Sequence, residues 1–132
     1  MVGERDLGQL LASMSPRLSE RMFAFASVPG SGDIPAGTTV VGTFLEDEGL
    51  SIIGPFEEFA WAGLQHSDAW AKISLTVHSS LSAVGLTATV SSALADRGIS
   101  ANIVAGFFHD HIFVPWDQRH LAMDVLTGLS GH

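Results

Sequence analysis

The chain has 132 residues, of which 46% are hydrophobic, and its six lysine and arginine residues against fourteen acidic residues give a net charge of −8. This length and apolar content suit one ordinary domain or two very small ones and exclude a disordered chain. The acidic balance repels phosphate backbones and anionic lipid heads, so we expect no nucleic acid and no membrane partner, and it favours small cationic ligands. Cysteine is absent, which excludes disulfides and thiolate metal sites.

The N-terminal segment, MVGERD, carries charges of both signs ahead of a short apolar stretch. It lacks the basic region and the long apolar region of a signal peptide. No apolar run reaches the roughly 18 residues that a membrane span needs. We therefore expect a cytoplasmic protein.

The first half of the chain predicts a helix, a strand, a loop, a hairpin and a second helix. Asp6 is suited to cap a helix over residues 7–14, whose apolar residues recur at helical spacing, and Pro16 marks its end. A buried strand follows over residues 22–28, then a loop rich in proline and glycine over residues 29–37, and a hairpin with arms at 39–46 and 50–53. Pro55 suits the first position of a helix that Gly63 can stop.

The second half predicts a strand, a helix, a hairpin and a final helix. Residues 71–78 alternate cleanly between apolar and polar side chains, as a strand with one buried face does. The next helix has competent N-caps in its serines and ends before a glycine; these positions are Ser79, Ser80, Ser82 and Gly98. The hairpin has arms at 101–108 and 112–114, with His109, Asp110 and His111 around its turn, and Asp117 opens the last helix.

Each half is one strand short of the β-α-β-β-α-β unit, and in the first half a loop replaces the crossover helix. An open sheet edge has to be paired or covered. We therefore expect the two halves, residues 1–67 and 68–132, to lend each other strands, or a second copy of the chain to cover the edge in a homo-oligomer. The predicted class is α+β, an antiparallel sheet with helices on one face.

The segment SSLSAVGLTATVSSALADRGISANIVAGFFHDHIFVP, residues 79–115, resembles an ACT domain, the amino-acid-binding regulatory module of aspartate kinases. The shared features are Gly85 in the first turn of the helix, the Gly98-Ile99 stop, and a hairpin ending in Asp110-His111-x-x-Val-Pro. This last pattern is similar to the ACT repeats of the animal cytosolic arginine sensor. The resemblance implies a ferredoxin-like ACT fold, with residues 1–67 a degenerate ACT-like half and residues 68–132 an ACT domain, in a small stand-alone tandem protein.

The resemblance also implies a ligand site, in which an amino acid would meet the backbone at the strand-to-helix turn and place a basic side chain near Asp110. The N-terminus of a helix independently offers unpaired N–H groups, and Gly85 has no Cβ to block close approach. The expected function is regulation by an amino acid or a related metabolite, with no catalysis and no cofactor. The expected ligand-binding residues are Ser79, Ser80, Val84, Gly85, Leu86, His109 and Asp110.

Other interpretations remain open. The chain can be an assembly module without a ligand, in which the serines only cap the helix, Gly85 is a close helix–sheet contact and Asp110 is a turn former. Metal chemistry at His109 and His111, with His78 as a third donor, fits no established motif, so no metal is expected. The sequence also contains no nucleophile elbow and no phosphate loop, so an enzyme is the class with least support.

Overall fold

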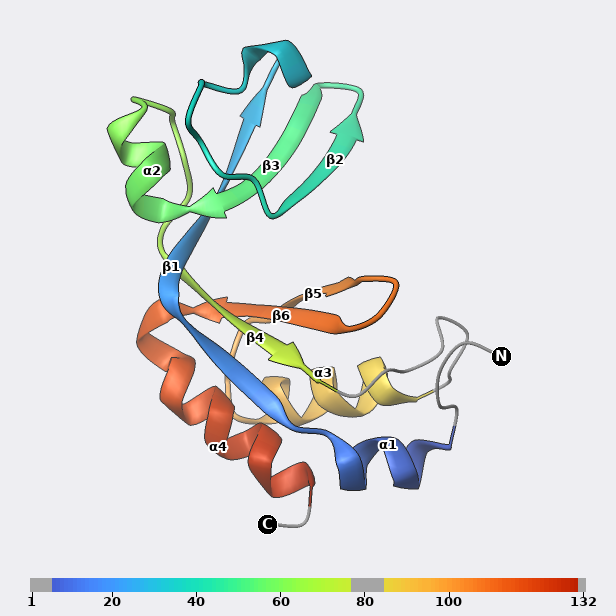
Figure 1. The fold of residues 1–132 in the computed structure, drawn as a ribbon. Helices are drawn as coiled ribbons and strands as arrows, with labels where there is room; N and C mark the ends of the chain where they lie inside the picture. The colour runs from blue at the N-terminus through green and yellow to red at the C-terminus, as the bar shows by residue number, and fades with distance from the viewer. Residues whose placement is uncertain (1–5, 77–84, 131–132) are drawn as a thin grey trace. The chain divides into compact units, whose positions relative to one another are not determined.

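The computed structural model of the chain describes residues 6–76 and 85–130 and confirms the α+β class. An antiparallel sheet of six strands carries the helices, and the hydrogen-bonded strand order is β2-β3-β1-β4-β6-β5 (Figure 1). The strands are β1 (Pro16–Val28), β2 (Gly42–Glu46), β3 (Gly49–Pro55), β4 (Trp70–Leu75), β5 (Asn102–Ala105) and β6 (Asp110–Pro115). The helices are α1 (Leu7–Ser13), α2 (Phe56–Trp61), α3 (Leu86–Asp96) and α4 (Arg119–Leu129), with 3₁₀ turns at Ser31–Asp33 and Trp116–Gln118.

The chain forms two compact units that do not follow one another along the sequence. Unit 1 comprises residues 1–19 and 71–132, and unit 2 comprises residues 20–70. Strand β1 crosses the boundary, so its first residues belong to unit 1 and its remainder to unit 2. The N-terminal segment therefore completes the sheet of the C-terminal unit, which is the sharing of strands that two incomplete halves require.

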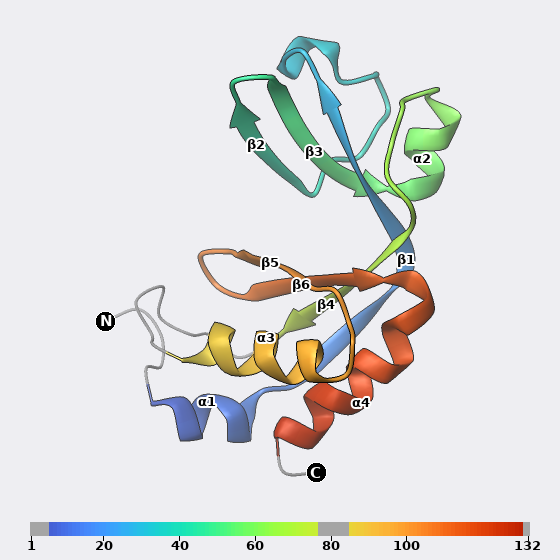
Figure 2. The ribbon, with the colours of Figure 1, turned by 180° about the vertical axis from the view of Figure 1, so that it is seen from behind.

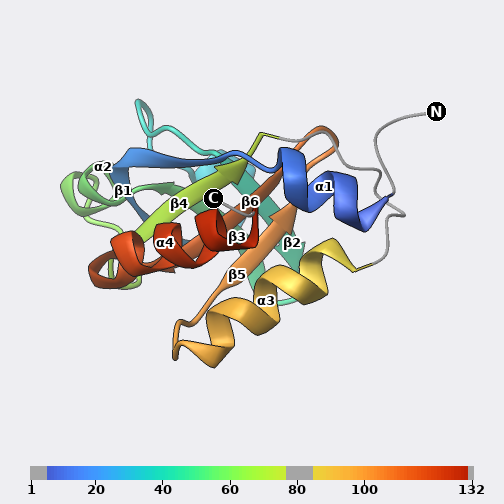
Figure 3. The ribbon, with the colours of Figure 1, turned by 90° about the horizontal axis from the view of Figure 1, so that it is seen from below.

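In unit 1 the helices α1, α3 and α4 pack against one face of strands β1, β4 and β6 (Figure 3). This core buries side chains from all three helices and from the inward face of the strands. Its fully or almost fully buried members include Leu10, Ala71, Ile73, Leu75, Val90, Leu94, Ile112, Val114 and Leu126. The predicted alternation of β4 is confirmed, because Ala71, Ile73 and Leu75 are buried while Lys72 and Ser74 are not.

The first strand is longer than the sequence predicts. Helix α1 does begin after Asp6, whose carboxylate accepts a 2.9 Å hydrogen bond from the Gln9 amide. Strand β1, however, begins at Pro16 and not at residue 22. Its first half reads as polar because its exposed residues are charged, whereas Leu18 faces the core.

The hairpin turn also differs from the prediction. Strands β5 and β6 pair with Val104 opposite His111 and Ala105 opposite Asp110, and the Gly106 amide donates to the His109 carbonyl at 2.9 Å. Asp110 and His111 therefore lie in strand β6 and not at the turn. The expectation that Asp110 is a turn former is wrong.

Helix α3 begins later than the serine caps suggest. Its N-cap is Gly85, which has no side chain to accept a capping hydrogen bond. The serines proposed as caps lie outside the described residues, as do Val84 and the end of the predicted strand 71–78. The final helix begins at Arg119, because Asp117 lies in the preceding 3₁₀ turn.

Unit 2 is a three-stranded antiparallel sheet, β2-β3-β1, with helix α2 packed on it (Figure 2). The loop between β1 and β2 contains a single 3₁₀ turn, so the predicted absence of a crossover helix is confirmed. Phe59 of α2 is fully buried in a small core with Ala24, Val28, Leu50 and Ile52. The segment at His66 and Ser67 also pairs with β1: the Ser67 amide donates to the Phe25 carbonyl at 2.9 Å, and His66 forms an isolated antiparallel bridge with Ala26.

Candidate functional site

The N-terminus of α3 is the first element of the candidate site in unit 1. Gly85 has a φ of 101°, in the left-handed region that favours glycine, and its carbonyl accepts the first helical hydrogen bond, from Thr89, at 2.8 Å. A Cβ atom at this position would lie 3.2 Å from Leu7 Cδ2. Leu86 is buried in the core, so its side chain serves packing and its amide is the group that it can offer a ligand. The helix thus opens with backbone N–H groups at an N-cap residue, Gly85, that has no side chain to cap them.

Asp110 is the second element. It is 9% exposed, and among the described residues it is the charged one that is buried. It shares the helix-facing side of β6 with Ile112 and Val114, which belong to the core of unit 1. A buried carboxylate requires hydrogen-bond donors or a positive charge, so a residue of this kind at the end of a strand is a candidate anchor for a ligand.

His109 and His111 lie on the opposite face of the same sheet from Asp110. Both line a cavity of about 400 Å³. The described residues that line it are Arg17, Ser19, Lys72, Ser74, Leu75, Thr76, His109 and His111. The hairpin therefore does bring the two histidines to one face, but it separates them from Asp110, with which the sequence groups them.

His111 is held in place by a neighbouring strand. Its Nδ1 atom and the Ser74 hydroxyl are 2.8 Å apart and share a hydrogen bond. Burial lowers the pKa of His111 below its ordinary value of 6.5, and the charges of Lys72 and His109 lower it further, against an opposing contribution from Asp110. The neutral form of His111 therefore predominates at pH 7.

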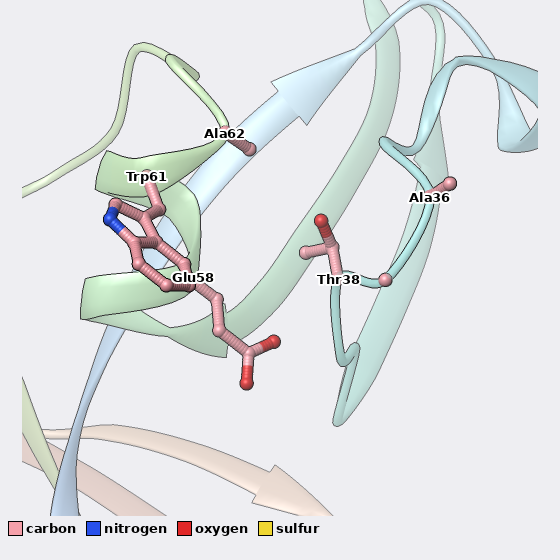
Figure 4. Close-up of a pocket in the computed structure, with 6 residues that line it drawn as sticks. Ala36, Thr38, Glu58, Trp61 and Ala62 are labelled. Atoms are coloured by element: carbon pink, nitrogen blue, oxygen red, sulfur yellow. The ribbon is translucent and has the colours of Figure 1, made fainter.

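Unit 2 has a cavity of its own, about 210 Å³, between α2 and the loop that replaces the crossover helix (Figure 4). Glu58 and Trp61 of the helix line it, together with Ala36 and Thr38 of the loop. Glu58 is already engaged, since it accepts hydrogen bonds from the Thr39 amide at 2.7 Å and from Arg21 at 3.1 Å. Trp61 is 96% exposed, so it fills no core.

The sequence prediction missed the basic and hydroxyl side chains that accompany the two histidines. Lys72, Ser74 and Thr76 form the polar side of the alternating strand, and this alternation was the signal that could have found them. Arg17 lies in the first part of β1, ahead of the strand that the sequence predicts over residues 22–28. In the described part of the chain, no three side chains of the metal-binding types gather at one point.

None of the helices in the described ranges has the length and the apolar character that crossing a membrane requires.

Two models of the ACT domain match the chain. One matches residues 65–128 and the other residues 2–71, so together they cover both halves of the sequence. The comparison with curated proteins found no match.

Several solved structures share this fold. A Vibrio cholerae protein described as being of unknown function and a possible transport protein is 41% identical, with 94% of this chain and 95% of that chain covered and a TM-score of 0.85. An Agrobacterium tumefaciens protein is 21% identical, with 89% of each chain covered and a TM-score of 0.73. The regulatory subunit of aspartate kinase from Thermus thermophilus is 14% identical, with 89% of this chain and 97% of that chain covered and a TM-score of 0.67.

Proposed function

The chain belongs to the ACT-domain family, and from this premise we propose that it is a regulatory module that binds an amino acid or a related small metabolite in unit 1. The proposed binding residues on the described chain are Gly85, Leu86 and Asp110; Ser79, Ser80 and Val84, which the proposal also includes, lie outside the described residues. The mechanism is a change in packing, which requires that the ligand bind two arrangements of the protein with unequal affinity. Catalysis has no part in this proposal.

The observation that carries the proposal is the buried carboxylate of Asp110 on the strand face that the helices cover. Burial of a charged group is costly unless donors or an opposite charge compensate it, so a buried carboxylate at this position is suited to hold a positively charged group. The N-terminus of α3 supplies the complementary chemistry, because its N–H groups and partial positive charge suit the α-carboxylate of an amino acid. A carboxylate and a set of N–H donors are together what a zwitterionic ligand requires.

Thermal unfolding in the presence of each standard amino acid tests the proposal. A ligand at about 100 times its Kd adds about 2.7 kcal/mol to the free energy of unfolding, so the Tm rises by several degrees. We expect Asp110→Asn to abolish the shift that the effective amino acid causes. Asp117→Asn is the matched control, because Asp117 is exposed in the 3₁₀ turn and its substitution removes the same charge.

A glycine pair provides an independent check on the same site. Gly85 and Gly98 lie at the two ends of α3, and both have a positive φ, 101° and 71°. Gly85→Ala and Gly98→Ala should each destabilise the fold by about 1–2 kcal/mol through backbone strain. Gly85→Ala should in addition weaken binding of the amino acid, whereas Gly98→Ala should leave the affinity for the amino acid unchanged.

Self-association without a ligand is the alternative function, and one observation favours it. Strand β2 is at the edge of the sheet and exposes two large apolar side chains, Phe44 at 74% and Leu45 at 75%. Exposed apolar edge strands pair readily with other strands. An assembly module predicts a Tm that rises with protein concentration and responds to no amino acid, and this outcome would replace the sensor proposal.

A further inference from the structure

We propose that the cavity on the face of the unit 1 sheet opposite α1, α3 and α4 binds a small organic anion bearing phosphate or carboxylate groups. This cavity is separate from the amino-acid site proposed above, because Asp110 and its neighbours in the core lie on the other side of the same strands.

The first argument is the concentration of positive charge. The chain has a net charge of −8 and contains only six lysine and arginine residues, yet Arg17 and Lys72 both line this cavity together with His109 and His111. None of the described lining residues is acidic. In a strongly acidic chain, this local reversal of sign attracts anions to one place on the surface.

The second argument is geometry. Arg17 is on β1, Lys72 on β4 and His111 on β6, and these three strands are consecutive neighbours in the sheet. The charged side chains therefore stand on a hydrogen-bonded framework and not on loops. Ser74 adds a hydroxyl beside His111. Guanidinium, ammonium and hydroxyl groups are the donors that phosphate and carboxylate oxygens accept.

The third argument is size. A volume of about 400 Å³ lies within the range of sites that hold metabolite-sized ligands. An inorganic ion leaves much of this space unfilled, so the fitting ligand is an organic molecule with its charged end among the basic residues. Phosphate and carboxylate compounds share this chemistry, and the experiment separates them.

The histidine adds a pH dependence with a definite sign. The charges that act on His111 are those of Lys72 on β4 and of its hairpin neighbours His109 and Asp110, and Arg17 on β1 lines the same cavity. Because the pKa of His111 is below 6.5, its imidazole is mostly neutral at pH 7 and gains its proton when the pH falls. An anion favours that protonated form, so binding tightens as the pH falls from 7 through the lowered pKa of His111.

Calorimetric titration of the full chain at low ionic strength tests the proposal, with ribose 5-phosphate and citrate as probes and ribose as the uncharged control. We expect one or both anions to bind and ribose to show no heat of binding. Lys72→Gln and Arg17→Gln should each lower the affinity for the anion by about tenfold. His111→Gln should reduce the gain in affinity at low pH, and the preferred probe identifies the ligand as a phosphate or a carboxylate.

Arg97→Gln is the matched control, because Arg97 is exposed at the end of α3 and loses the same charge outside the cavity. The proposal is overturned if neither anion binds, or if Arg97→Gln weakens binding as much as Lys72→Gln does, since diffuse attraction would then explain the result. Asp110→Asn separates this proposal from the amino-acid site. This variant should lose the rise in Tm that the amino acid causes but should still bind the anion. Each proposal can therefore fail without the other.

Discussion

Gly54 in strand β3 shows how one residue fixes the packing of unit 2. A Cβ atom at this position would overlap the carbonyl oxygen of Thr39 and would lie 2.7 Å from the ring of Phe59, a side chain that is fully buried. Neither neighbour can move easily, because the Thr39 oxygen is part of the backbone and the Phe59 ring is packed in the core. The absence of a side chain at Gly54 is therefore what allows the loop and helix α2 to close on β3.

Gly54→Ala should reduce the free energy of unfolding by about 1–3 kcal/mol, because overpacking displaces the ring of Phe59 or the strand. Gly42→Ala, in the paired strand β2, is the control. Its Cβ would meet Ile53 at 3.5 Å, an ordinary contact, so we expect no loss of stability. Urea unfolding of both variants gives the comparison, and equal losses would show that the tight contact at Gly54 has no energetic effect.

At the scale of elements, the loop between β1 and β2 is tied to helix α2 by one carboxylate. Glu58 accepts hydrogen bonds from the backbone amide of Thr39 at 2.7 Å and from its hydroxyl at 3.4 Å. The hydrogen bond from the Thr39 amide is the main reason that the pKa of Glu58 is lowered. This carboxylate therefore stabilises the fold above its ordinary pKa of 4.5, and the contribution is lost as the pH falls below that value.

Glu58→Gln should speed hydrogen exchange at the Thr39 amide several-fold while leaving strand β3 protected, because local opening of the loop does not require global unfolding. Glu57→Gln is the matched control, because Glu57 also accepts a hydrogen bond from Arg21, at 2.8 Å, whereas the Thr39 amide donates to Glu58. Equal exchange at Thr39 in the two variants would contradict the anchoring role of Glu58.

Two strands show where sequence patterns stop being informative. The periodicity of residues 71–78 sufficed for β4, because one of its faces is buried and the other is not. In β6, Asp110 and His111 carry the local signals of a turn, but pairing with Ala105 and Val104 places them in the strand. The pairing register of the strands depends on tertiary contacts. This register places Asp110 on the other face of the sheet from the histidines, and no local sequence pattern predicts that separation.

At the scale of the whole molecule, the N-terminal segment belongs to the fold of the C-terminal unit. Leu10 and Met14 are buried in the same core as β4, α3 and α4. Ser15 accepts hydrogen bonds from the amide and the hydroxyl of Thr76 at 3.3 Å and 3.0 Å. Contacts between residues so distant in sequence join the two ends of the chain in one core.

Leu10→Ala should therefore destabilise unit 1 by about 2–5 kcal/mol, as removal of a fully buried leucine does. Gln9→Ala, on the exposed side of the same helix, should change stability by no more than about 0.5 kcal/mol. The readout is the unfolding of unit 1, followed by hydrogen exchange in β4 and β6. If Leu10→Ala affected exchange in unit 2 alone, the assignment of α1 to unit 1 would be wrong.

The central claim is that unit 1 binds an amino acid between the start of α3 and Asp110. The most direct measurement is a titration of the ¹⁵N-labelled full chain, followed by amide chemical shifts, with the amino acid that raises the Tm. We expect the largest shifts at Gly85, Leu86 and Asp110, and small ones in unit 2. Shifts confined to residues 20–70, or no shifts with any standard amino acid, would contradict the account.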